Sequence, residues 1–307
     1  PKWKGAFITD KSSLKSHNEE GKTVFLHSNL SWRSIVMLTN TSRSLTYLVS
    51  ILYTLLGIVL FFQPEQMSTV FAWKVTGFMT MTIGGWCLGN AWLAFAAASR
   101  WEWRLNHPAL IYLWTFGVLE ALVVISFRAK LQLVHPVAWL YLVTLTVNVL
   151  IAILGITGWM HLRPSAVSSE GNTRFGSFLA NGFVLFVGGL GLYGLIAKMG
   201  WIGTNGEIFP EIMSAFTLRS FGAFYFSLTV GMIPVLFGKS ITPLLNYGYM
   251  AYGLIVIIMI AACVYLPSFN FQEHPFGIVY FAAYLVAGIL LGVLFIRHGT
   301  GGSKRIS

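Results

Sequence analysis

Residues 64–77 read PEQMSTVFAWKVTG, and residues 210–222 read PEIMSAFTLRSFG. Both stretches run Pro-Glu-x-Met-Ser, then apolar residues that include Phe, then a cation, two further residues and Gly. In each case a long apolar run follows or overlaps the cation. A phrase that occurs twice beside similar apolar runs predicts an internal duplication.

The chain as a whole is much more apolar than a soluble domain. Of its 307 residues, 56% are hydrophobic and 10% are charged, whereas soluble domains carry about 25% charged residues. Apolar runs of about 20 residues can cross the hydrocarbon core of a membrane as helices, and none of these runs alternates as barrel strands do. We therefore predict an all-α integral membrane protein with eight transmembrane helices. The expected spans are 44–62, 71–97, 109–127, 137–160, 177–199, 215–237, 244–266 and 276–296.

A second pair of stretches supports the duplication. HPALIYLWTFGVLEAL at 107–122 aligns with TPLLNYGYMAYGLIVI at 242–257, which pairs Tyr112 with Tyr247. Four spans in each copy give both copies the same orientation, so we expect parallel repeats related by an axis along the membrane normal. The expected organisation is a polar basic arm at 1–43, a four-helix unit at 44–162, a cytoplasmic linker at 163–176, a second four-helix unit at 177–298 and a flexible basic tail at 299–307.

The net charge of +10 is concentrated in the arm, in alternate loops and in the tail. By the positive-inside rule, both termini are expected in the cytoplasm, in a bacterial-type plasma (inner) membrane. One loop disagrees, because Arg128 and Lys130 fall on the expected outer side. The arm and tail are expected to contact anionic lipids, with Trp32 anchoring a short interfacial helix. Cations placed at span ends do not favour nucleic-acid binding.

Three ionisable residues near or within the spans are candidate ligand or ion-pair residues. Lys74 and Arg219 are expected about three to five residues inside the second and sixth spans, where both could extend to the headgroups. Glu120 is the one acidic residue deep within an expected span. Because an unpaired carboxylate in hydrocarbon is costly, we hypothesise an ion pair between Lys74 and Glu120. The second copy has Ile255 in place of Glu120, so Arg219 would use Glu120, Glu211 or a lipid phosphate.

Motifs of catalysis and cofactor binding are not recognisable. We identify no catalytic or metal-ligating residues, and the seven histidines all lie in loops, in the arm or at helix ends. Cys87 and Cys263 are expected as packing residues within spans. No cofactor is identifiable, although a bound lipid, quinone or pigment stays open.

Glycine pairs indicate close packing between helices. Gly188 and Gly191 belong to GGLGLYG, and Gly288 and Gly292 form GILLG in the last span. Small residues at such spacing let neighbouring helix backbones approach one another. We also expect Asn90 and Asn148 to form hydrogen bonds between helices.

The two opening stretches, read as FFQPEQMSTVFAWKVTG and IFPEIMSAFTLRSFG, resemble the start of the second helix in DoxX-like small four-helix bacterial membrane proteins. The resemblance covers about a tenth of the chain and implies a tandem duplication of that unit. Some relatives are quinone-linked or thiol-linked redox subunits. The lack of a paired-Cys motif here argues against thiol redox chemistry.

Three functions follow as hypotheses. The leading one is a non-catalytic accessory or scaffold subunit of a larger membrane complex, with other integral membrane subunits as partners. The second is a small-molecule or ion carrier with a polar site at the interface of the repeats. The third is a quinone-linked redox subunit.

Overall fold

The computed structural model describes residues 38–164, 174–202, 204, 212–238 and 240–299. Within these residues the chain is helical and has no strands. The long helices are α2 (Asn40–Phe62), α4 (Gly77–Ser99), α5 (Trp103–Ser126), α6 (Pro136–Leu162), α7 (Arg174–Ile196), α8 (Ala215–Phe237), α9 (Thr242–Val264) and α10 (Gly277–Gly299). Short helices connect them: α3 (Pro64–Ser68), η1 (Arg128–Lys130) and η2 (Leu266–Ser268).

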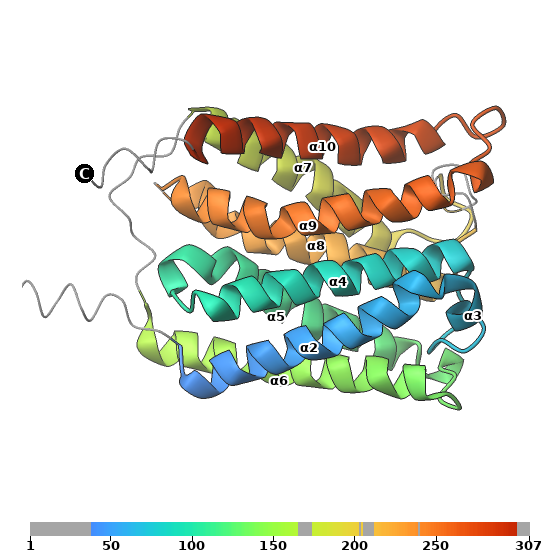
Figure 1. Cartoon of the computed structure of the whole chain (residues 1–307), viewed down its shortest axis with the longest axis horizontal. Helices are drawn as coiled ribbons and strands as arrows, with labels where there is room; N and C mark the ends of the chain where they lie inside the picture. The colour runs from blue at the N-terminus through green and yellow to red at the C-terminus, as the bar shows by residue number, and fades with distance from the viewer. Residues whose placement is uncertain (1–37, 165–173, 203, 205–211, 239, 300–307) are drawn as a thin grey trace, which may run out of the picture.

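The long helices run side by side in two layers (Figure 1). One layer has the order α2, α4, α9, α10, and the other has the order α6, α5, α8, α7. Contacts of α2 with α6 and of α5 with α9 join the layers. The first residue of α2 and the last turn of α10 lie at the same end of the bundle (Figure 1).

Seven of the long helices have the length and composition to cross a membrane, so the chain is a multi-pass membrane protein. The helix outside this group is α4, which is 23 residues long and contains threonine and glycine residues besides one asparagine. Its polar side chains include Thr80, Thr82 and Asn90, which are all buried. Because α4 lies between α2 and α9 and also contacts α5, these side chains face protein.

The second expected span begins later than the sequence predicts. We expected it at 71, but α4 begins at Gly77, after the hydroxyl of Thr76 accepts a hydrogen bond from the backbone N–H of Met79 at 3.3 Å. A hydroxyl in this position is a common N-terminal cap. Residues 71–76 are not helical. Lys74 therefore precedes the helix instead of lying inside it.

The non-helical segment packs against the other copy of the repeated phrase. Trp73 is buried, stacks on Phe216 with ring centroids 4.2 Å apart, and donates a hydrogen bond to the hydroxyl of Thr217 at 3.1 Å. In the second copy, Ser214 caps α8 directly, and α8 begins at Ala215 as predicted. The described parts of the two phrases therefore differ in structure. Residues 71–76 form a non-helical segment that covers the end of the bundle, whereas the second phrase is helical from Ala215.

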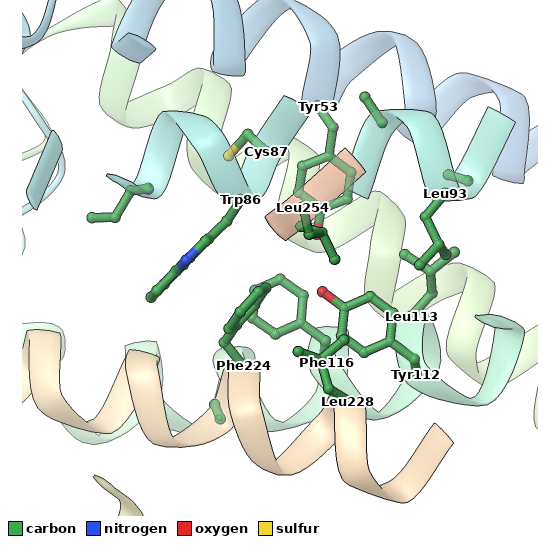
Figure 2. Packing of buried hydrophobic residues seen from close by; sticks show 14 of the residues in the cluster. Tyr53, Trp86, Cys87, Leu93, Tyr112, Leu113, Phe116, Phe224, Leu228 and Leu254 are labelled. Atoms are coloured by element: carbon green, nitrogen blue, oxygen red, sulfur yellow. The ribbon is translucent and has the colours of Figure 1, made fainter. Parts of the chain in front are cut away.

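The centre of the bundle is an aromatic core formed by α4, α5 and α8 (Figure 2). The rings of Trp86 on α4 and Phe224 on α8 stack with centroids 4.4 Å apart. Phe116 on α5 meets Phe224 edge to face. Figure 2 shows Tyr112 beside these rings, with its hydroxyl directed toward α4. Helices predicted to belong to different repeats thus share one continuous core.

Several expectations lie outside the described residues. They concern Trp32 and its interfacial helix, most of the basic arm, most of the linker at 163–176 and nearly all of the basic tail.

Candidate functional site

Glu120 lies on α5 and is 3% exposed. Its Oε1 accepts two hydrogen bonds, one from the hydroxyl of Tyr141 on α6 at 2.7 Å and one from the hydroxyl of Ser220 on α8 at 2.8 Å. Helix α8 belongs to the second predicted repeat, so the carboxyl group joins the two halves of the chain.

A cavity of about 30 Å³ lies beside Glu120. Its lining comes from α2, α4, α5, α6 and α8 together with the non-helical segment before α4. Trp73 lines it at the end of the bundle, and Trp86, Cys87 and Asn90 line it from α4. All four side chains are buried. The space is large enough for one or two water molecules.

Three buried polar atoms of residues that line the cavity make no hydrogen bond to the described part of the chain. They are Glu120 Oε2, Trp86 Nε1 and Asn90 Nδ2. Buried polar groups are nearly always hydrogen-bonded, because an unpaired one loses its interactions with water. Three such atoms around one cavity indicate a site that a small polar molecule completes.

The predicted ion pair between Lys74 and Glu120 is wrong. Lys74 is exposed in the segment before α4, and the only ion pair among the described residues joins Arg104 to Glu102 at 3.3 Å. Trp73, the residue next to Lys74, lines the Glu120 cavity. The chain therefore places an indole group at the carboxyl pocket and leaves the lysine outside, where its charge remains solvated.

Arg219 forms a different contact from the three that we considered. Its guanidinium donates to the backbone carbonyls of Gly194 and Ala197, both at 2.7 Å. These carbonyls lie at the C-terminal end of α7, where carbonyl groups lack helical partners and the helix dipole favours a cation. Arg43 contacts the end of α4 in the same way, donating to the carbonyl of Ala98 at 2.8 Å. Arg219 is thus a structural cap and does not contact Glu120.

A second polar cluster lies next to the carboxyl pocket. Asn148 on α6 donates to the hydroxyl of Tyr53 on α2 at 3.0 Å, and Tyr112 on α5 donates to Oδ1 of Asn90 on α4 at 2.5 Å. Both asparagines therefore bond between helices as predicted, although Asn90 acts there as the acceptor. Tyr53 and Asn90 also line the cavity.

In the described part of the chain, the predicted close packing is found at the glycines of α7 but not at those of α10. Gly191 supports close packing, because a Cβ placed there would lie 2.3 Å from the backbone nitrogen of Phe226 on α8. A Cβ placed at Gly188 would lie 3.0 Å from the methyl carbon of Thr229. On α10, by contrast, a Cβ at Gly292 would meet no atom within 4 Å, and one at Gly288 would meet only Ile255, at 3.7 Å. Among the residues that the structure describes, the prediction of close packing at Gly288 and Gly292 is therefore wrong.

Those two glycines line an open apolar groove between α9 and α10, with a volume of about 720 Å³. The α9 side of the groove includes Met259, Ile260 and Cys263. Cys263 is exposed, whereas Cys87 is buried. This groove is the second candidate site, and its chemistry suits an apolar partner.

Sequence reasoning did not single out Tyr141, Ser220 and Trp86. One signal points to Tyr141: HPVAWLY at 135–141 and HPFGIVY at 274–280 share His-Pro and a later Tyr at the same spacing. Ser220 and Trp86 carry no signal of this kind, because isolated Ser and Trp residues are common in apolar helices. They belong to the site only because α4 and α8 both pack on α5.

No protein-family model, curated protein or solved structure matches this chain.

Proposed function

We propose that this protein is a non-catalytic accessory subunit of a larger membrane complex, and that a transmembrane helix of a partner protein fills the groove between α9 and α10. The observation that carries the proposal is the glycine pair Gly288 and Gly292, which lines an open apolar groove and packs closely on nothing in the described chain. Glycines four residues apart allow a second helix backbone to come close. An acyl chain of a lipid needs no such surface.

The burial of the outer helices supports the same proposal. In the most apolar part of α2 and of α6, 44% of the residues are buried within the chain. The corresponding values for α7 and α10 are 17% and 11%. The two ends of the helix layers therefore differ, and the α7–α10 edge has apolar surface left for a partner.

The topology proposed with this function has both termini in the cytoplasm of a bacterial-type plasma membrane. In that topology α4 is the eighth span, and two parallel four-helix repeats are related by an axis along the bundle. Support comes from the helix order, since the neighbours α2–α4, α4–α9 and α5–α6 correspond to α7–α8, α8–α5 and α9–α10. The resemblance to DoxX-like units remains part of this proposal.

Site-specific photo-crosslinking in native membranes tests the docking. A photoreactive residue replaces Ile289 in the groove, and the control replaces Leu150, which is exposed on α6. We expect one protein adduct of defined mass from position 289 and only lipid adducts from position 150. Lipid adducts alone at both positions would contradict the proposal. Loss of the protein adduct in Gly292→Leu would show that the groove itself holds the partner.

The second candidate is a carrier, and the observation that favours it is the Glu120 pocket at the contact of α5 with α8. In proteoliposomes with an imposed potential, a proton-coupled carrier would show proton uptake that Glu120→Gln abolishes. Proton uptake equal to that of empty liposomes would exclude proton-coupled transport by the isolated protein.

A further inference from the structure

We propose that the cavity beside Glu120 binds one or two water molecules together with an exchangeable proton carried on Glu120 Oε2. This inference does not depend on the α9–α10 groove, and either proposal can fail without the other. The reasoning begins with the two oxygens of the carboxyl group, which have different surroundings.

Oε1 accepts hydrogen bonds from both Tyr141 and Ser220, whereas Oε2 has no partner within the described residues. Two donors at Oε1 suit the carbonyl oxygen of a carboxylic acid and leave Oε2 as the atom that carries the proton. A proton on Oε2 then needs an acceptor in the space beside it. Water provides this acceptor, because its oxygen accepts two hydrogen bonds while its two O–H groups donate two more.

The other unpartnered atoms require the same ligand. Trp86 Nε1 and Asn90 Nδ2 can only donate, so they also need an acceptor. Each of these atoms exposes less than 1 Å², and both residues line the cavity. A volume of about 30 Å³ limits the ligand to molecules of water size, which excludes a quinone or a sugar from this cavity.

The charges around the carboxyl group favour the protonated form. The titratable groups that line the cavity are Tyr53 from α2, Cys87 from α4 and Tyr141 from α6, and α8 contributes the uncharged Ser220. None of these groups is a cation. Lys74 is exposed, and the guanidinium of Arg219 bonds to α7. A buried carboxylate without a neighbouring cation is strongly disfavoured, so the group is neutral.

A row of hydroxyl groups on α8 leads from the end of the bundle toward the cavity. The hydroxyls of Ser214 and Thr217 lie 2.9 Å apart, and Ser220 follows one helical turn later with its bond to Glu120. Ser214, at the cap of α8, is half-buried. Because Ser220 bonds to Oε1, the row ends at the carboxyl group itself, and the exchange at Oε2 passes through the cavity water. On protonation, an O–H bond of a hydronium ion in the cavity breaks as an O–H bond forms at Oε2; the reverse step returns the proton to water, with no change of oxidation state.

Infrared spectroscopy of the full chain in lipid nanodiscs tests the proposal, with D₂O exchange as the probe. We expect a carboxylic-acid C=O band at neutral pH that shifts in D₂O and is absent from Glu120→Gln. The matched control is Glu65→Gln, an exposed carboxyl group outside the bundle core, which should leave the band unchanged. Absence of a Glu120-dependent band would overturn the proposal, and so would a band that does not respond to D₂O.

A second variant keeps the test informative if Glu120→Gln does not fold. Trp86→Phe retains the aromatic packing on Phe224 but removes the indole N–H. We expect the band to persist at a shifted frequency, because the bridging water loses one of its donors. An unchanged frequency would show that no water connects Trp86 to the carboxyl group.

Discussion

The contact between α5 and α6 and the contact between α9 and α10 occupy corresponding places in the helix order, but they differ in chemistry. In the first, Glu120 and Tyr141 form a hydrogen bond inside a buried pocket. In the second, Ile255 aligns with Glu120, and Tyr280 aligns with Tyr141 in the His-Pro motif. Ile255 is half-buried and lines an open groove, with Gly288 on the α10 side.

The outer helices explain part of this difference. Helix α2 packs on α6, and Asn148 and Tyr53 join them by a hydrogen bond inside the bundle. At the corresponding edge, the guanidinium of Arg297 on α10 lies over the ring of Phe175 on α7, 4.9 Å from its centroid, near the helix ends. The α5–α6 contact thus borders a polar site that α8 completes, while the α9–α10 contact leaves an apolar surface.

The largest expected effect concerns the shared aromatic core. Trp86→Ala removes a buried ring that stacks on Phe224, and large-to-small changes of this kind cost about 3–5 kcal/mol. Leu285→Ala in the groove removes a side chain that is 58% exposed, so we expect less than about 1 kcal/mol. Unfolding of the purified protein in mixed micelles by a denaturing detergent measures both. Equal losses would contradict the distinction between a closed core and an open groove.

The glycines provide the next comparison. Gly191→Leu forces a side chain into the backbone of Phe226, and overpacking typically costs about 1–3 kcal/mol. Gly292→Leu adds a side chain where no atom lies within 4 Å, so the isolated protein should keep its stability. The same unfolding assay separates them. A strongly destabilised Gly292→Leu protein would mean that α10 packs more closely than the structure shows.

The two cations of the repeated phrases should also behave differently. Arg219→Met removes two hydrogen bonds to the end of α7, and hydrogen bonds to charged groups contribute about 1.5–3 kcal/mol each at most. Because Arg219 is half-buried, we expect a loss of about 1–2 kcal/mol, as for a favourable charge at a helix end. Lys74→Met should be neutral. Protease sensitivity of α7 is an independent readout, since only the Arg219 variant should expose it.

The smallest effects come from individual bonds to the carboxyl group. Tyr141→Phe and Ser220→Ala each remove one hydrogen bond to Oε1, with an expected cost of about 1 kcal/mol. A double-mutant cycle with Glu120→Gln should show coupling for both residues. The cycle that joins Lys74→Met to Glu120→Gln should be additive. Measured coupling between Lys74 and Glu120 would contradict the structure, in which these two side chains form no ion pair.

Sequence reasoning predicted the helical membrane fold because apolar runs of span length leave few alternatives. It also identified Glu120 as a buried polar group, because Glu120 is the one acidic residue deep within a predicted span. It misplaced Lys74, because helix propensity and hydrophobicity do not reveal that Phe71 packs on Tyr141 and Trp73 on Phe216, so that the helix begins only at Gly77. Arg219 could not be assigned either, since its partners are backbone carbonyls of another helix, which have no signature in sequence.

The side chains around the cavity show a similar limit. Periodicity indicates that Trp86, Asn90 and Ser220 lie on helices, but only the tertiary packing shows that they surround one carboxyl group. The open glycines of α10 were recognisable as a packing motif from their spacing. The arrangement of the helices decides whether such a motif packs inside the chain or against another protein. The spacing of the glycines is the same in both cases.

The central claim is that a partner helix fills the α9–α10 groove, and Cys263 offers a direct probe because it lines that groove near the end of α9. We would measure the labelling of Cys263 by a membrane-permeant maleimide in native membranes and again after purification of the chain alone, with Cys263→Ser as the blank. The account predicts protection in the membrane, rapid labelling of the isolated protein, and loss of protection in Gly292→Leu. Equal labelling in both preparations would contradict it.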